Sequence, residues 1–199
     1  MTAVRTHPLR ATSLAALPSL LLGACLALYP AHVARAQDLL PLVGGGAGNS
    51  FSLVCPTGAV LTGVRARREQ VLRAIGPRCR PVRADGTLGD ETDAGPVWGG
   101  PGGEAYARSC GEGAVVAQQT AGFDGARLSH LAYQCFRWLP AARRWDAAGP
   151  GDALVVLQER VSPAPRSVSR CPAAARPADG IRGRSGMLVE SVGLRCDGP

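Results

Sequence analysis

The stretch CPTGAVLTGVRARREQVLRAIGPRC, residues 55–79, holds two short apolar runs between two cysteines. The first run, AVLTGVRAR, follows a Pro-Thr-Gly turn sequence and contains β-branched residues, as a short strand does. The second run, QVLRAIGPRC, has the same character, with Gly76 and Pro77 near its end. The stretch therefore predicts two strands.

Six cysteines, including the two of this stretch, form three pairs of similar spacing. The members of a pair are separated by 24 or 25 residues in every case. An even number of cysteines in an exported chain is typical of a disulfide framework, and the absence of CxxC argues against a metal site. Six cysteines permit fifteen pairings. The regular spacing favours pairing within each unit: Cys55 with Cys79, Cys110 with Cys135, and Cys171 with Cys196.

The sequence around the cysteine pairs also repeats. The units end in AIGPRC (74–79), HLAYQC (130–135) and SVGLRC (191–196), with apolar and small residues in the same order. Such self-similarity is the mark of an internal repeat. We predict three pseudo-repeats, at about residues 44–95, 96–152 and 153–199.

The N-terminus has the features of a secretory signal. Arg5 and Arg10 precede an apolar stretch, and Ala34-Arg35-Ala36 supplies the small residues of a cleavage site. We therefore expect a signal peptide at 1–36 and one domain at 37–199, either secreted or periplasmic. The alternative is a lipid anchor at Cys25, because Leu22-Gly23-Ala24-Cys25 resembles a lipobox. The apolar residues after Cys25 favour simple secretion. Beyond this region no apolar run approaches the ~20 residues of a membrane helix.

The charge of the chain is carried by arginine, since the sequence has no lysine. The net charge of +7 falls to about +4 once Arg5, Arg10 and Arg35 leave with the signal. Arginine together with abundant Ala, Gly and Pro is typical of a GC-rich bacterial genome. Arg65, Arg67 and Arg68 form a small cluster without the interleaved aromatics of a nucleic-acid site, so we expect no nucleic-acid partner.

Further short runs extend the β prediction along the chain. With 26 Gly and 16 Pro, no window is long enough for an amphipathic helix. An all-β domain of three repeats could be a β-trefoil or a β-prism, and spacing does not separate them. The expected strands are GAVVAQQT (113–120), RLSHLAYQCFRW (127–138), DALVVLQERV (152–161) and MLVESVGLRC (187–196), and the expected surface loops are 83–95, 99–103, 140–152 and 162–167.

Two resemblances favour the prism. GRSGMLVESVG (183–193) resembles the C-terminal binding segment of jacalin-related mannose-binding lectins, which are β-prism I proteins. The opening CPTGAVLTGV and the paired-cysteine units resemble the repeats of vitelline membrane outer layer protein, another β-prism. The resemblances imply a disulfide-closed β-prism I of three pseudo-repeated four-stranded sheets.

The lectin resemblance also implies a sugar site. In that family the sugar lies between a glycine-rich turn and a GxxxD loop. Here the turn would offer Gly45 and Gly46, and the loop would offer Gly186, Met187, Leu188 and Glu190, with Glu190 where the family has Asp. The implied partners are glycans, of mannose type in the lectins, and no cofactor or metal is implied.

The first two units lack this acid. The positions of Gly186 and Glu190 correspond to Glu69 and Arg73 in the first unit. In the second unit they correspond to Gly125 and Ser129. We therefore expect the third unit alone to bind by the lectin mode.

Other functional groups give weaker indications. His130 is the sole histidine after residue 36, has no nucleophile motif beside it, and is expected on the solvent side of a strand, so we expect no enzyme. The acidic loop DGTLGDETD (85–93) does not have EF-hand spacing. Trp98, Trp138 and Trp145 could stack on sugars, but a core role is favoured. The alternative function is a structural or protein-interaction scaffold of an envelope or extracellular matrix.

Overall fold

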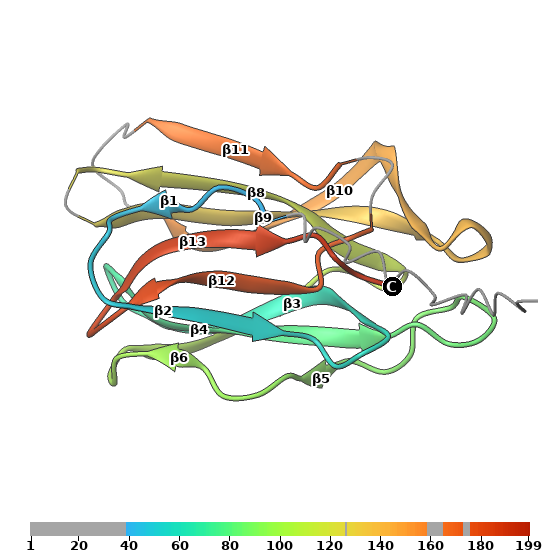
Figure 1. The fold of residues 1–199 in the computed structure, drawn as a ribbon, viewed down its shortest axis with the longest axis horizontal. Coiled ribbons are helices and arrows are strands. Elements are labelled where there is room, and N and C mark those ends of the chain that lie inside the picture. Colours follow the sequence, from blue (N-terminus) through green and yellow to red (C-terminus); the bar gives the residue numbers. More distant parts are fainter. Residues whose placement is uncertain (1–38, 126, 159–164, 173–175) are drawn as a thin grey trace, which may run out of the picture. The chain divides into compact units, whose positions relative to one another are not determined.

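The structure is a computed structural model, which describes residues 39–125, 127–158, 165–172 and 176–199 (Figure 1). The predicted signal peptide, its cleavage position and Cys25 lie outside the described residues. Within them the chain forms strands and one short 3-10 helix, η1, at Pro140–Ala142. No helix formed by these residues is long and apolar enough to span a membrane.

The strands form three antiparallel sheets, as the β-prism prediction requires. The first sheet has the order β5-β4-β3-β7, with β6 also paired to β4. It consists of β3 (Ala59–Arg68), β4 (Leu72–Pro81), β5 (Thr92–Asp93), β6 (Trp98–Gly99) and β7 (Glu104–Ser109). The second, in the order β10-β9-β8-β11, consists of β8 (Ala114–Phe123), β9 (Leu128–Leu139), β10 (Arg144–Gln158) and β11 (Arg166–Arg170). The third, in the order β1-β13-β12-β2, consists of β1 (Val43–Gly44), β2 (Asn49–Val54), β12 (Gly180–Ser185) and β13 (Val189–Arg195).

Each unit gives its first strand to the sheet of another unit. The strands β2, β7 and β11 precede the hairpins β3–β4, β8–β9 and β12–β13, respectively. However, β2 pairs with β12, β7 with β3, and β11 with β8. The edge beside β13 is filled by β1, from the other end of the domain. Each sheet therefore combines strands of two units. In the third sheet, the pairing of β1 with β13 and of β2 with β12 joins the two ends of the described domain.

The three predicted disulfides are confirmed. Cys55 is bonded to Cys79, Cys110 to Cys135 and Cys171 to Cys196. In each unit the bond ties the end of the exchanged first strand to the hairpin that follows. It thereby links two neighbouring sheets covalently.

The core lies between the three sheets and draws apolar residues from all of them. Leu61, Val116 and Ile181 come from different sheets, and none exposes any of its surface. Burial of such side chains contributes about 1.5–3 kcal/mol each, offset by lost conformational entropy. Trp138 and Trp145 are also buried, which confirms the core role expected for them.

Each central hairpin carries a β-bulge at the same place. One extra residue separates consecutive paired positions, and this residue is Arg73 in the first unit, Ser129 in the second and Glu190 in the third. A bulge leaves its extra residue unpaired and can re-aim its side chain. The three positions that the cysteine alignment matches therefore share one backbone feature.

Several sequence expectations were wrong in detail. Strands β1, β2, β7 and β12 were not predicted. Strand β5 lies inside the expected loop 83–95, β6 overlaps the expected loop 99–103, β10 begins inside the expected loop 140–152, and β11 begins inside the expected loop 162–167. Strands β7 and β11 are short edge strands with mostly exposed, polar residues, so they lack an apolar pattern. His130 is buried rather than solvent-facing, and Trp98 is exposed rather than in the core.

Candidate functional site

The glycine-rich segment 43–48 lies against the start of β13. The Gly45 N–H donates a hydrogen bond of 2.9 Å to the carbonyl oxygen of Glu190. Gly44 has a φ of 131°, and a Cβ placed on it would clash with that same oxygen. Only glycine permits this approach of the two backbones.

The Glu190 side chain stands beside this turn. It is half-buried, and among the described residues its carboxylate has no hydrogen bond or ion pair. A Cβ on Gly45 would lie 3.8 Å from Glu190 Oε2 and 3.6 Å from the ring of Phe123. Gly45 therefore lies close to both a carboxylate and an aromatic ring.

The loop between β12 and β13 is a tight turn. The Gly186 N–H donates to the carbonyl oxygen of Leu188 at 3.0 Å, and Met187 at its tip is 63% exposed. Arg184 holds the glycine-rich segment to this loop, since its guanidinium donates to the carbonyl oxygens of Ala47 and Gly48. The turn and the loop are thus fixed side by side.

The predicted site residues differ in their surroundings. Gly45 lies beside the Glu190 carboxylate, whereas Gly46 is exposed, and a Cβ on it would have nothing within 4 Å. Leu188 is half-buried, and Met187 is largely exposed to solvent.

Two aromatic residues near the site were not predicted as members of it. Phe123 ends β8 and reaches the site from another sheet. Trp98 is 43% exposed and, with Asn49 and Gly186, lines a groove of about 280 Å³. A weak signal for Trp98 was present in the sequence, because this residue precedes the glycine-rich run GGPGG. Phe123 had no such signal, since only the packing of two sheets brings it close.

The first sheet contains a copy of the turn with the opposite charge. The Gly100 N–H donates to the carbonyl oxygen of Arg73 at 3.0 Å, and Gly99 has a φ of 138°. Arg73 in turn forms an ion pair of 3.5 Å with Glu69. In the second unit Ser129 is buried. Among the three bulge residues, Glu190 is thus the sole carboxylate.

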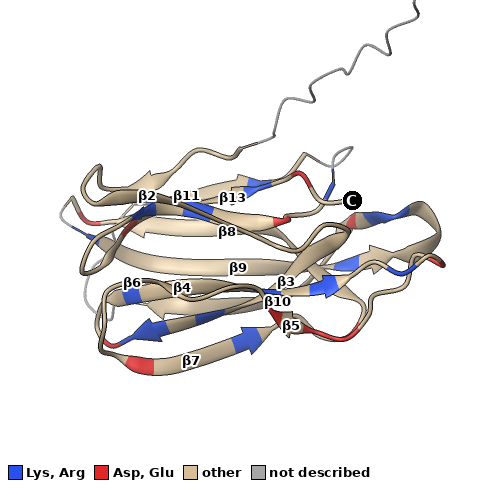
Figure 2. Cartoon of the chain, turned by 60° about the horizontal axis from the view of Figure 1, so that its bottom comes forward, with Lys and Arg blue, Asp and Glu red and all other residues tan. Residues whose placement is uncertain are grey.

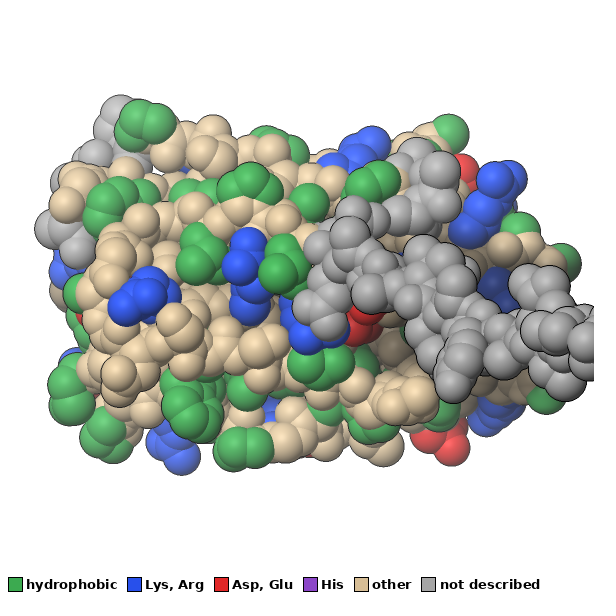
Figure 3. Space-filling model, viewed as in Figure 1, with side chains coloured by type: hydrophobic (Ala, Val, Ile, Leu, Met, Phe, Trp, Pro, Cys, Tyr) green, Lys and Arg blue, Asp and Glu red, His purple; other side chains and the backbone are tan. Residues whose placement is uncertain are grey.

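The arginine cluster of β3 is distributed over different partners. Arg65 pairs with Asp93 at 3.1 Å, and the Arg68 guanidinium stacks 4.0 Å from the Tyr106 ring centroid. Figure 2 shows basic and acidic residues interspersed on this sheet. On the part of the surface in Figure 3 that is not drawn in grey, the basic side chains lie in separate groups. Two of the three arginines are therefore engaged in contacts within the domain.

His130 has the electrostatics of a core residue. Burial, and secondarily the positive charge of Arg166, lower the pKa of its imidazole. Its Nδ1 atom has no hydrogen-bond partner in the described part of the chain. A catalytic triad would instead hold this atom against a carboxylate.

Comparison with known proteins places the fold in one structural class. No family model matches the sequence, and no curated protein does. Among solved structures, wild-type Malaysian banana lectin has a TM-score of 0.53 at 14% identity, covering 82% of this chain and 100% of its own. A mannose binding jacalin related lectin from Ananas comosus has a TM-score of 0.52 at 18% identity, covering 82% and 99%. The artocarpin–mannopentose complex has a TM-score of 0.56 at 10% identity, covering 81% and 97%.

The fold is therefore the β-prism of the jacalin-related lectins, as predicted, and not a β-trefoil. At these identities the likeness establishes the shared fold. The particular resemblances of residues 183–193 and of the cysteine units remain predictions.

Proposed function

We propose that this protein is a secreted, non-catalytic, carbohydrate-binding protein that recognises glycans at the Glu190 loop. The observation that carries the proposal is the unpaired Glu190 carboxylate beside Gly45. A carboxylate that is half-buried without a partner is costly unless it binds something or stays hydrated. Its chemistry suits two neighbouring hydroxyl groups, each of which would donate a charge-assisted hydrogen bond.

The surroundings of Glu190 support a sugar over other ligands. The glycines of the turn have no side chain to keep a sugar ring away from the backbone, and Phe123 offers an apolar surface to its C–H groups. Gly46, Gly186, Met187 and Leu188 would form the outer wall. Glu190 is about 1.5 Å longer than the Asp of the lectins, so the sugar would sit correspondingly further out. Mannose-type glycans are the first candidates, since several proteins with this fold are described as mannose-binding or as complexes with mannose oligomers.

Export of the protein is part of the proposal. Three disulfides suit an oxidising compartment, in agreement with a signal peptide at 1–36. A periplasmic or lipid-anchored form would present the same domain to solvent. The identities and spacing of the site residues do not depend on which of these applies.

The test is a glycan-array screen of the purified, oxidised protein, followed by calorimetry with the glycans that bind. We expect Glu190→Gln and Glu190→Ala to abolish binding while the melting temperature stays within a few degrees. Asp152→Asn is the matched control, because Asp152 is exposed on β10 and has no ion pair among the described residues. Binding that survives both Glu190 variants would refute the site.

The alternative is a scaffold that binds other envelope or matrix proteins. It would be favoured if the correctly oxidised protein bound no glycan. The protein would then have the β-prism fold without binding a glycan at Glu190.

A further inference from the structure

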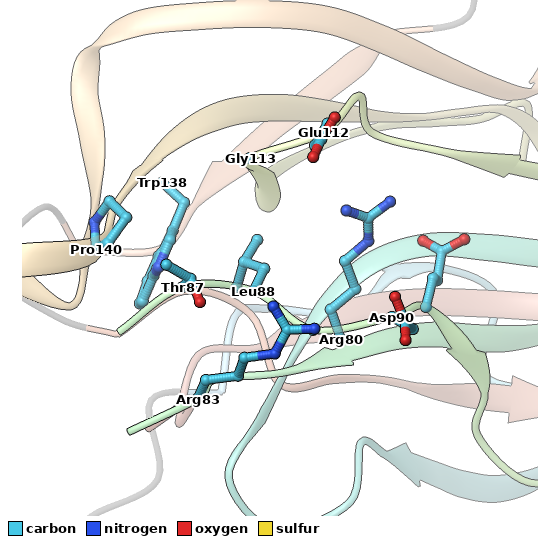
Figure 4. A pocket seen from close by; sticks show the side chains of 11 residues that line it. Arg80, Arg83, Thr87, Leu88, Asp90, Glu112, Gly113, Trp138 and Pro140 are labelled. Carbon is cyan, nitrogen blue, oxygen red and sulfur yellow. The ribbon is translucent and has the colours of Figure 1, made fainter. Parts of the chain in front are cut away.

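A second cavity lies at the other end of the strands from the Glu190 loop. It has a volume of about 480 Å³, within the range of small-molecule sites. The loop 83–91 forms one side, the turn at Glu112 and Gly113 another, and the end of β9 at Trp138 a third (Figure 4). In Figure 1 the loops after β4 and β9 lie at the opposite end from the β12–β13 turn.

Two arginines line this cavity. Arg80 lies near the end of β4 and Arg83 begins the loop, and Figure 4 shows both side chains extending into the cavity. Neither forms an ion pair with any described residue. The Arg80 Nε atom is buried and has no hydrogen-bond partner there either. A guanidinium group presents a planar fork of N–H donors, which matches the oxygens of a carboxylate or sulfate group.

Two carboxylates of the same cavity are also unpaired. Asp90 and Glu112 line it, and neither has an ion pair in the described part of the chain. The neighbouring Glu91 is different, since it accepts hydrogen bonds from Thr62 and Ser109 and pairs with Arg78 at 3.0 Å. Glu91 is therefore structural, whereas Asp90 and Glu112 remain available to accept hydrogen bonds from a ligand.

The third side of the cavity is apolar and rigid. Trp138 is buried, and its Nε1–H donates to the Gly86 carbonyl oxygen at 2.7 Å, which fixes both the ring and the loop. Leu88 and Pro140 continue this side. An anionic group, several hydroxyl donors and an apolar ring face would together satisfy all three sides.

We propose that this cavity binds an acidic saccharide, whose carboxylate or sulfate group pairs with Arg80 and Arg83. Its hydroxyl groups donate to Asp90 and Glu112, and its ring lies against Leu88 and Pro140. The proposal is independent of the Glu190 site, because the two sites share no residue.

The experiment is calorimetric titration of the whole oxidised protein with four compounds at low salt. These are a uronic-acid disaccharide, a sulfated disaccharide, a neutral disaccharide and sodium sulfate. In the Glu190→Gln variant, which lacks the proposed glycan site, we expect the acidic disaccharides to bind and the neutral one to fail, and the stronger of the two acidic compounds identifies the anionic group. Binding of sulfate alone as tightly as the saccharides would overturn the saccharide assignment.

Variants test the location of binding. Arg80→Gln and Arg83→Gln should each weaken binding about tenfold or more, as expected for loss of a hydrogen bond to a charged group. Arg67→Gln, an exposed arginine of β3 outside the cavity, should have no effect. Glu190→Gln should also have none, which separates this proposal from the proposed glycan function. Undiminished binding by both cavity variants, or no binding of either acidic disaccharide, would overturn it.

Discussion

The N–H of Gly45 donates to the carbonyl oxygen of Glu190 at 2.9 Å, and this bond adds to the contacts of β1 with β13 that join the beginning of the domain to its end. The corresponding bond of the first sheet joins Gly100 of the second unit to Arg73 of the first at 3.0 Å. The same backbone arrangement thus presents a carboxylate in one unit and a guanidinium in another. The backbone supplies the position, and the bulge residue supplies the chemistry.

Gly45→Ala should weaken glycan binding without unfolding the protein. The added methyl would meet Phe123 and Glu190 at ordinary contact distances of 3.6–3.8 Å, and it would fill the space proposed for the sugar. We expect a loss of about tenfold in affinity, comparable to one hydrogen bond to a charged group. Calorimetry measures it. Gly111→Ala is the control, because a Cβ there meets nothing within 4 Å. Equal affinities of the two variants would contradict the location of the sugar.

Trp98→Ala should affect long ligands more than short ones. Trp98 is exposed and lines the groove beside Gly186, where a second sugar ring would lie. We expect affinity for an oligosaccharide to fall about two- to tenfold, the value of an aromatic contact, while monosaccharide affinity and melting temperature stay unchanged. An equal loss for both ligands would show that Trp98 contacts the first ring instead.

Removing one disulfide should destabilise the domain strongly. The double variant Cys110→Ala, Cys135→Ala opens a loop with a sequence separation of 25 residues. Loop entropy predicts a loss of about 3–4 kcal/mol in the free energy of unfolding. Urea denaturation followed by circular dichroism measures it. A free energy equal to that of the oxidised wild type would rule out a stabilising role for this bond.

His130 should make the protein less stable in mild acid. Burial lowers its folded-state pKa below the ordinary value of 6.5. The unfolded chain therefore takes up the proton first, and stability that is complete above about pH 6.5 falls as the pH decreases toward the folded-state pKa. Melting temperatures between pH 8 and pH 5 test this expectation. His130→Gln should flatten the profile over that range, and an unchanged slope in the variant would assign the effect to other groups.

Tyr133→Phe should stabilise the protein slightly. The Tyr133 side chain is fully buried, and its hydroxyl has no hydrogen-bond partner among the described residues. Removing an unsatisfied buried group is expected to add about 1 kcal/mol to the free energy of unfolding. Tyr106→Phe is the matched comparison, since the Tyr106 hydroxyl donates to the Val155 carbonyl oxygen at 2.9 Å and its loss should destabilise. Destabilisation by both changes would indicate that the Tyr133 hydroxyl is satisfied.

Strand composition and cysteine spacing were enough to predict the β class and the three disulfides. These features are local or pairwise, so they can be read without knowing which strand lies beside which. The alignment of the units on their second cysteines also matched Arg73, Ser129 and Glu190, which all occupy the bulge of their hairpin. Each of these residues lies at the same sequence distance from the second cysteine of its unit. This distance is a local property, so the sequence alone was enough to match the three positions.

The sharing of strands between units, and the meeting of side chains from different sheets, could not be predicted in the same way. The exchanged strands β7 and β11 are polar edge strands without an apolar pattern, so nothing local reveals their partners. Phe123 reaches Gly45, and Arg80 and Glu112 line one cavity, because three sheets close around one core. Such contacts depend on the packing of whole faces, and a pattern along one strand does not contain that information.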